Sequence, residues 1–596
     1  MKEYGFNIEN VCQKARQLCD PTILPLKIQN KISLSLGEYE DRVQDRIALL
    51  SSQDFCQRLW QKDATLWKSV SDKQEMIRNS LGWLDIVDKM IESLDEIKAF
   101  IQEIKDAGFR HVVHMGMGGS SLAPLVFLRT FSAENGLALS VLDTTDPASI
   151  KKLEESIPIE NTLFIVASKS GSTAEPLAFK DYFYELVKKI KGDRAGENFV
   201  VITDPNNSLE KTAKLQGFRR IFLNASDIGG RYSALSYFGL IPAALMGINV
   251  GEVLNRAREA VHSTLSVGRR DDCPALILGA TLGELALHKR NKVTLIMDKR
   301  IESFGLWLEQ LMAESTGKEG KGLIPIANEA LGTPSSYGTD RLFVNLTVKN
   351  AEKNSENVVF KNAVAALKDF GHPVICIEIA DCFDLGEEFF LWEFATAVAG
   401  AVLEINAFDQ PNVQESKDNT DRLLAQVTEN LPKEKPKLSE GSLSFYSNST
   451  ATSGADFLSQ LLKKATSGDY IAIMAFLPET PSAHDILQNL RRSLRDKLKL
   501  ATTLGYGPRF LHSTGQLHKG GPNTGIFLQL TADDSVDLPV PGRPYSFGIF
   551  KSAQAQGDLE ALIKHKRRTL RIHLGSNIEK GLRELEGLMN SALNFK

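Results

Sequence analysis

Two short stretches of the chain place glycines and hydroxyl side chains where one apolar run ends and another begins. The first, HVVHMGMGGSSLAPLVF, spans residues 111–127, and the second, ASKSGSTAEP, spans residues 167–176. Each follows a strand-like run and opens a helix-like one. The free N–H groups at a helix start point outward and the helix dipole favours an anion there, so both turns predict a bound phosphate. A Ser- or Thr-rich turn that only caps its helix is the alternative.

The two turns lack the spacing of the common nucleotide-binding motifs, GxxxxGK[ST] and GxGxxG. Ligands in open α/β sheets collect at the carboxyl ends of the strands, and two such turns on neighbouring strands favour a shared phosphate over simple capping. The residues expected to hold it are Gly118, Gly119, Ser120, Ser168, Lys169, Ser170 and Thr173.

An alternation of strand-like and helix-like segments must position these turns. Residues 1–107 carry apolar residues at helical spacing and predict helices. Beyond them, short apolar runs such as HVVHMG, NTLFIV and NFVVIT alternate with polar segments, which indicates βαβ units around a parallel sheet. The alternation resumes at KVTLIMDK and again at DYIAIMAFL. The predicted fold class is α/β, with parallel-sheet domains flanked by helices and an additional C-terminal α/β segment.

Domain boundaries follow from this pattern. We predict a helical N-terminal region at 1–105, a first α/β domain at 106–265, a second at 266–430, a linker at 431–454 and a C-terminal α/β domain at 455–596. The linker is inferred from the Lys, Pro, Ser and Gly content of NLPKEKPKLSEGSLSFYSNSTATSG. We expect the N-terminal region to pack over the first α/β domain.

Composition argues against several classes of function. The 596 residues are 42% hydrophobic and 24% charged, with a formal net charge of -4, which is typical of a soluble globular protein and not of a dedicated nucleic-acid binder. The six cysteines form no CxxC pair, which favours free thiols in a reducing compartment. The chain shows neither a signal peptide nor an apolar run long enough to span a membrane. We expect a cytoplasmic protein that binds neither nucleic acid nor membrane.

Longer motifs resemble a known family. GMGGSSLAP and ASKSGSTAEP together resemble the sugar-phosphate isomerase (SIS) domain. GGRYSALSYFGLIPAALMG, FGLWLEQLMAESTGKEGKG and INAFDQPNVQESK resemble the phosphoglucose isomerase family, over residues 105–425. The C-terminal PRFLHSTGQLHKGGPNTGIFLQLT resembles the isomerase module of bifunctional transaldolase/phosphoglucose isomerase proteins, although the residues before the first motif leave no room for a transaldolase barrel. The resemblance implies SIS-type domains.

The resemblance also implies a reaction and its residues. The family interconverts glucose 6-phosphate and fructose 6-phosphate by ring opening and a cis-enediol proton transfer, with no metal or other cofactor. By resemblance, Glu314 in LMAESTGKEG is the base that moves the proton between C1 and C2. Arg231 in GGRYS would stabilise the enediolate oxygen. Gln310, one helical turn before the base, and Gln410 in FDQ would bind substrate hydroxyls.

Ring opening requires a proton donor at the ring oxygen and an acceptor at the C1 hydroxyl, and in the family a lysine and a histidine share that work. Lys417, which closes FDQPNVQESK, fits the lysine. The family histidine usually lies between the base and FDQ, where this chain has only His372, which we expect to be structural. LHSTGQ resembles the family's histidine motif, so we expect His512 to open the ring, with His518 as the second candidate.

Two other functions stay open. A non-catalytic SIS protein that binds sugar phosphate and regulates a partner would keep ASKSGST but has no reason to keep the base and the arginine. A dual phosphomannose/phosphoglucose isomerase is the other alternative. An amino-sugar synthase normally adds a glutaminase domain with an N-terminal Cys, whereas this chain begins MKEYG.

The oligomeric state is open between a monomer and a homodimer. In the family the ring-opening histidine comes from a neighbouring subunit. Here the candidate lies on the C-terminal segment, behind a linker that could reach about 25–30 Å as a flexible coil. We therefore expect the site to be complete within one chain.

Overall fold

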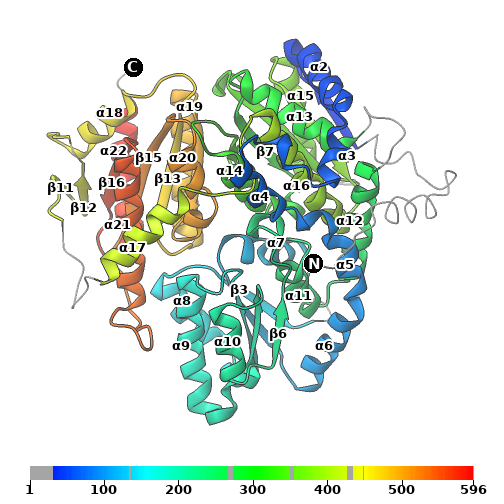
Figure 1. The fold of residues 1–596 in the computed structure, drawn as a ribbon. Helices are drawn as coiled ribbons and strands as arrows, with labels where there is room; N and C mark the ends of the chain where they lie inside the picture. Colours follow the sequence, from blue (N-terminus) through cyan, green and yellow to red (C-terminus); the bar gives the residue numbers. More distant parts are fainter. Residues whose placement is uncertain are drawn as a thin grey trace.

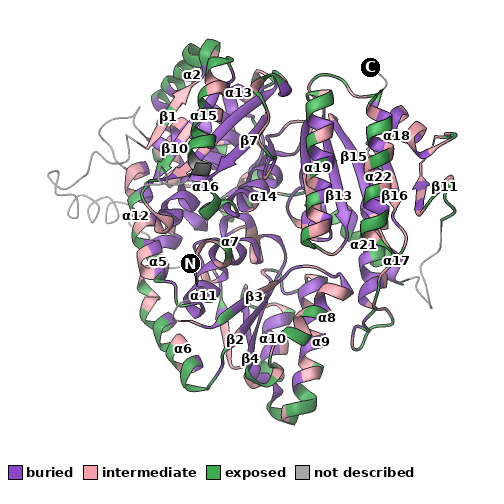
Figure 2. Cartoon of the chain, turned by 180° about the vertical axis from the view of Figure 1, so that it is seen from behind, coloured by how far each residue is buried: buried purple, intermediate pink, exposed green. Residues whose placement is uncertain are grey.

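The computed structural model describes residues 31–132, 136–265, 273–349, 355–425, 434–447 and 449–594. Across these ranges, three sheets flanked by helices form three lobes around a common centre (Figure 1). Burial follows the same plan, since the strands are mostly buried and the outer faces of the surface helices are exposed (Figure 2). The predicted α/β class, with parallel sheets flanked by helices, is confirmed.

The first sheet is parallel throughout, in the order β3-β2-β4-β5-β6. Strand β2 pairs with β4 from His111↔Thr162 to Met115↔Val166, so the two hydroxyl-rich turns follow neighbouring strands at one edge of the sheet. The elements of this domain are β2 (His111–Met115), η4 (Gly118–Ser120), α7 (Leu122–Thr130), β3 (Ala138–Leu142), α8 (Pro147–Ser156), β4 (Thr162–Ala167), α9 (Ala174–Lys191), β5 (Phe199–Thr203), α10 (Ser208–Leu215), β6 (Arg220–Leu223), η7 (Gly230–Tyr232) and α11 (Tyr237–Leu245). The next helix, α12 (Val250–Leu265), lies within the predicted bounds of this domain but packs mainly against α16 (Leu385–Val402) of the second domain.

The second sheet has the order β1-β10-β9-β7-β8. Helix α14 lies in the middle of the molecule and is buried over almost its whole length, which suits a helix that carries Gln310 and Glu314. The elements of this domain are α13 (Pro274–Leu287), β7 (Lys292–Met297), α14 (Phe304–Thr316), β8 (Ile324–Ile326), β9 (Arg341–Val348), α15 (Ser355–Asp369), β10 (Val374–Ile379) and α16 (Leu385–Val402). The next helix, α17 (Val413–Ala425), lies within the predicted bounds of this domain but packs against α21 (Phe547–Lys564) of the C-terminal domain (Figure 1).

The N-terminal region is mostly helical in its described part, from residue 31 onward, but it opens with a strand that the sequence analysis did not predict. Strand β1 (Ile32–Ser35) adds antiparallel to β10 of the second sheet. Helix α2 packs on α13 and α6 packs on α11, so the region contacts both α/β domains, not only the first as expected. Its helices are α2 (Glu40–Ser52), α3 (Phe55–Trp60), α4 (Ser71–Arg78), α5 (Ile86–Glu92) and α6 (Leu94–Asp106).

The third sheet has the order β11-β12-β16-β15-β13-β14 and belongs to the C-terminal domain. Its elements are β11 (Leu438–Glu440), β12 (Leu443–Tyr446), α18 (Gly454–Leu462), β13 (Tyr470–Phe476), α19 (Pro481–Leu498), β14 (Ala501–Tyr506), η12 (Arg509–His512), α20 (Gly515–Gly520), β15 (Gly525–Thr531), α21 (Phe547–Lys564), β16 (Arg568–His573) and α22 (Ile578–Leu593).

The linker expected at 431–454 needs correction in its described part. Residues 438–446 form a hairpin, and β12 joins the sheet by pairing antiparallel with β16. The reason is the alternation of buried Leu443 and Phe445 with half-buried neighbours, which gives a strand one apolar face despite its polar composition. Linker reach therefore does not bring His512 to the first domain; packing between folded domains does.

The second and third sheets repeat one topology. In the second, β8-β7-β9-β10 run parallel and β1 closes the β10 edge antiparallel. In the third, β14-β13-β15-β16 run parallel and β12 pairs antiparallel with β16. The first sheet shares the order of its four parallel strands, β3-β2-β4-β5, but its fifth strand, β6, is also parallel. The C-terminal domain thus matches the second α/β domain.

A buried arginine joins these two domains. Arg491 of α19 is 2% exposed, and burial lowers its pKa to about 10. Its Nη2 donates to the carbonyl of Ala327 at 3.1 Å and its Nη1 donates to the carbonyl of Asn328 at 2.8 Å, both in the second domain. A further bond runs from Nη2 to the Thr502 carbonyl at 2.6 Å.

We predict that Arg491→Met destabilises the protein by about 3–5 kcal/mol, because several buried carbonyl groups lose their donor. Arg492→Met is the matched control: its side chain is exposed and bonds Asn489 on the same helix, so a change within about 0.5 kcal/mol is expected. Chemical denaturation of both variants measures the difference. Equal losses in the two variants would contradict the role of Arg491.

Candidate active site

The guanidinium of Arg231 is the centre of the candidate site. The residue lies in η7, directly after two glycines, and is only 5% exposed. Its five acceptors come from α14 and from residues 407–410: Ser315 Oγ at 3.0 Å, Glu314 Oε2 at 3.4 Å, Gln410 Oε1 at 2.8 Å, and the carbonyls of Ala407 at 3.1 Å and Asp409 at 3.2 Å. So many bonds fix the cation beside the predicted base.

Glu314 is buried on α14, with 3% of its surface exposed. Burial raises the pKa of its carboxyl above the ordinary value, while the charges of Arg231 and His512 oppose that rise. The Nε2 group of Gln310, one turn earlier, lies 3.5 Å from Glu314 Oε2 and donates to the carbonyl of His512 at 2.6 Å. A carboxyl group with a raised pKa is a stronger base once it has lost its proton.

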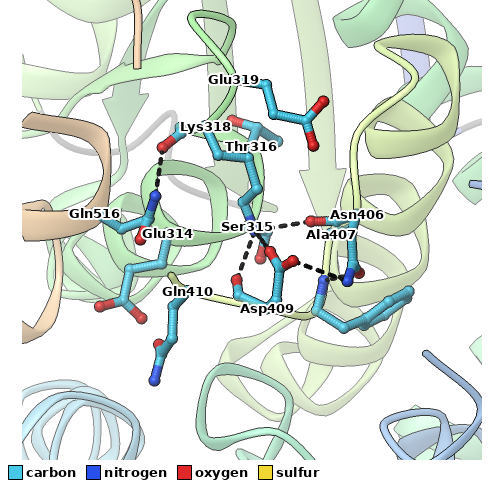
Figure 3. Close-up of polar contacts among 12 residues, drawn as sticks. Glu314, Ser315, Thr316, Lys318, Glu319, Asn406, Ala407, Asp409, Gln410 and Gln516 are labelled. Atoms are coloured by element: carbon cyan, nitrogen blue, oxygen red, sulfur yellow. Dashed lines mark hydrogen bonds and ion pairs between the residues drawn. The ribbon is translucent and has the colours of Figure 1, made fainter. Parts of the chain in front are cut away.

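Lys318 holds the end of α14 against the segment that contains Gln410. Its ammonium, 1% exposed, donates to the carbonyls of Asn406 at 2.7 Å and Asp409 at 2.5 Å and lies 2.9 Å from Asp409 Oδ1 (Figure 3). Burial and the charge of Arg231 lower the pKa of this lysine to about 8. This cluster sets the spacing between Glu314 and Gln410.

His512 reaches the site from η12 of the C-terminal domain. Its Nε2 lies 2.8 Å from Oε1 of Glu175, in the first turn of α9. Burial alone would raise the pKa of Glu175, but the charge and hydrogen bond of His512, with the charge of Lys417, bring it below the ordinary value. Glu175 therefore stays ionised and orients the imidazole, as carboxylates do for functional histidines.

The first glycine turn is where these elements meet. A Cβ on Gly118 would lie 2.6 Å from the His512 carbonyl oxygen and 2.7 Å from Gln310 Nε2. A Cβ on Gly119 would lie 2.1 Å from the Gly230 carbonyl oxygen, next to Arg231. Only glycine permits such close approach, so this turn brings η7, α14 and η12 together.

The second turn joins the same site through α9. Ser168 Oγ donates to Oγ1 of Thr173, which immediately precedes α9, at 3.0 Å, and Ser170 Oγ lies 3.0 Å from Ser172 Oγ. Ser168 is buried and Ser170 is exposed. The ammonium of Lys169 lies 2.5 Å from Asp204 Oδ2 and 3.2 Å from the Ser226 carbonyl. The positive charge that was expected to bind the phosphate is therefore paired with a carboxylate.

The other residues singled out in the sequence differ in how they lie relative to Glu175 and His512. Lys417 is exposed on α17, and its charge acts on Glu175 and Asp421. His518, the second choice for ring opening, is 3% exposed and packs against aromatic rings of the C-terminal domain, where burial lowers its pKa well below the ordinary value. His372 packs against Phe343 and Phe370, away from the site.

Sequence reasoning missed three residues that hold the site together. Glu175 stood inside the quoted ASKSGSTAEP, but an acidic residue in a first helical turn reads as a capping group. Lys318 lies in ESTGKEG, within the motif that was quoted for Glu314. Gln516 donates to the Gly317 carbonyl at 3.0 Å and to Asn412 Oδ1 at 2.8 Å, which ties α20 to the end of α14. Their positions in the motifs were the only available signal.

Within the described ranges, no group of three or more His, Cys, Asp or Glu side chains is placed to hold a metal ion. No helix among the residues that the structure covers combines the length and apolar character needed to cross a membrane.

Comparison with known proteins relates part of the chain to a family. Residues 72–329, which include Arg231 and Glu314, match the family described as phosphoglucose isomerase. Glucose-6-phosphate isomerase of Fusobacterium nucleatum is 28% identical over 393 residues, which cover 58% of this chain and 87% of that protein.

Two solved structures share the fold. A hypothetical protein from Thermus thermophilus is 26% identical, with a TM-score of 0.56, over 66% of this chain and 100% of that one. A glucose-6-phosphate isomerase from Chlamydia trachomatis, 18% identical, aligns with a TM-score of 0.54 over 72% of this chain and 96% of its own. A large part of the chain, residues 72–329, is therefore similar to the phosphoglucose isomerase family.

Proposed function

We infer that this protein is an aldose–ketose isomerase that interconverts glucose 6-phosphate and fructose 6-phosphate. The observation that carries this function is the buried contact between Glu314 and Arg231, at 3.4 Å, beside the glycine turn that follows β2. A carboxylate base next to a fixed cation is what an enediol intermediate requires. The relatives named as glucose-6-phosphate isomerases support the same substrate pair.

Proton transfer follows from the arrangement of these groups. The substrate phosphate would bind the two turns at the carboxyl ends of β2 and β4, which leaves the sugar chain to extend toward α14. Glu314 takes the proton from C2 of the open-chain aldose and returns it to C1, and the hydroxyl proton moves from O2 to O1 in the enediol intermediate. Arg231 stabilises the negative oxygen of the enediolate. The side-chain amides of Gln310 and Gln410 would form hydrogen bonds with substrate hydroxyls.

Ring opening is assigned to His512 with Lys417. One group protonates the ring oxygen while the other accepts the proton of the C1 hydroxyl. The ionised Glu175, whose Oε1 lies 2.8 Å from Nε2 of His512, fixes the direction of the imidazole ring. A reaction that moves one proton between two carbons and opens a hemiacetal needs no further group from a cofactor.

The repeated topology supports a site complete within one chain. The C-terminal domain has the strand order and directions of the second α/β domain, and it supplies His512 where the family resemblance implies a histidine from a neighbouring subunit. We therefore propose that this domain takes the place of a partner subunit and that the active form is a monomer. We also propose that the protein is cytoplasmic and does not bind nucleic acid.

The first prediction concerns the base. Glu314→Gln should lower kcat by about 10²–10⁴-fold and leave KM nearly unchanged, because only the proton acceptor is lost. Glu319→Gln, a few residues further on and paired with Lys68, is the control and should keep wild-type activity. A coupled assay gives the rates, and hydrogen exchange between C2 and deuterated solvent reports proton abstraction. Exchange at the wild-type rate in Glu314→Gln would exclude Glu314 as the base.

The second prediction concerns the phosphate. Thr173→Val removes a hydroxyl from the second turn and keeps the size of the side chain. It should raise KM for fructose 6-phosphate far more than it lowers kcat, as expected when ground state and transition state lose the same contact. Thr212→Val, whose hydroxyl bonds the Ser208 carbonyl within α10, is the control. An unchanged KM in Thr173→Val would refute the assignment.

The third prediction concerns the single-chain site. His512→Ala should impair turnover of the closed-ring substrate and spare the exchange at C2 of an open-chain analogue. Mixing His512→Ala with Glu314→Gln protein should restore no activity, since neither chain can lend its intact residue to the other. Recovery of activity on mixing would show that subunits share the site.

A further inference from the structure

A glutamine of the C-terminal domain contacts the same oxygen as the ring-opening histidine. Gln554 of α21 donates from Nε2 to Glu175 Oε1 at 2.7 Å, and His512 Nε2 lies 2.8 Å from that oxygen. Gln554 is 3% exposed and Glu175 is 5% exposed, so water does not replace this bond easily. None of the motifs considered in the sequence includes this glutamine.

The direction of the amide is set from its other side. Thr145, fully buried after β3, donates its hydroxyl to Oε1 of Gln554 at 2.7 Å. If the amide were turned over, its carbonyl oxygen would face the Glu175 carboxylate and two acceptors would meet without a hydrogen. Thr145, Gln554 and Glu175 therefore form a line of hydrogen bonds that ends at His512.

Other contacts of α21 fix the helix without this amide. The ammonium of Lys551 lies 2.8 Å from Asp146 Oδ2, and it also pairs with Asp534. Lys519, from α20, lies 2.7 Å from Asp558 Oδ1. Because these buried pairs hold α21 in place, the Gln554 amide serves the carboxylate that it contacts and is not needed for docking.

We propose that Gln554 is a positioning residue for ring opening, acting through Glu175 on His512; this rests on the proposed function. A carboxylate oxygen with two fixed donors cannot rotate away from the imidazole. With the amide removed, the carboxylate gains freedom and a buried charge loses a hydrogen bond. The proton transfer at C1 and C2, which Glu314 performs, does not involve this line of bonds.

The test separates the two steps by their products. Ring opening alone exchanges the α and β anomers of glucose 6-phosphate, which magnetisation-exchange NMR measures at equilibrium. In a Glu314→Gln background isomerisation is suppressed, so the anomer exchange reports the His512 step. Adding Gln554→Leu should slow this exchange about 10–100-fold, the range for losing a hydrogen bond to a charged group. In the wild-type background, the exchange of hydrogen at C2 of an open-chain analogue should stay unchanged.

A matched control and a second variant accompany Gln554→Leu. Gln556→Leu, on the same helix but bonded to Glu560, should leave the anomer exchange unchanged. Thr145→Val removes only the hydroxyl that orients the Gln554 amide, so it should slow the anomer exchange less than Gln554→Leu does. This second variant tests the proposal if Gln554→Leu does not fold.

The two failures can be told apart. The role of Gln554 would be overturned if folded Gln554→Leu or Thr145→Val protein exchanged the anomers at the parent rate while His512→Ala lowered the exchange to the uncatalysed rate. A wild-type protein that catalyses neither isomerisation nor anomer exchange would overturn the proposed function itself.

Discussion

The burial of one guanidinium governs the centre of this molecule. A cation removed from water must be surrounded by acceptors, because an unpaired buried charge costs several kcal/mol. Arg231 meets that requirement with oxygens from α14 and from residues 407–410, which lie far apart in the sequence. These segments must converge for the chain to fold, and their convergence places Glu314 beside the cation. The stability of the core and the geometry of the proposed base thus share one cause.

A second charge pair extends the site into the C-terminal domain. Glu175 is buried in the first domain and takes its hydrogen bonds from His512 and Gln554, both of the C-terminal domain. The domains meet again where Arg509 forms two bonds to Asp143, at 2.7 and 2.9 Å. Because these carboxylates would be costly to bury alone, the docked arrangement of the domains is also the arrangement that completes the site.

Local patterns predicted what depends on neighbours in sequence. The α/β class, the two turns and the placement of Glu314 on a helix followed from apolar spacing and from motifs. Strand β1 was missed because ISLS is four residues long and finds its partner, β10, more than 300 residues later. The composition of the hairpin at 438–446 predicts a linker because its polar residues outweigh the two buried apolar residues of β12, Leu443 and Phe445. Glu175 gains its role only from a distant histidine, which no local pattern can reveal.

The repeated topology gives the two matching domains different tasks. In the second, the helix after the first parallel strand, α14, carries Gln310 and Glu314; its counterpart α19 carries Arg491, which serves the interface. In the C-terminal domain, the segment after β14 carries His512; its counterpart after β8, ANEALGTPSSYGTD, has no histidine. Each domain therefore holds the group that the other lacks. Two domains of one topology within a single chain are free to differ in this way, whereas identical subunits of a symmetric dimer must each keep both groups.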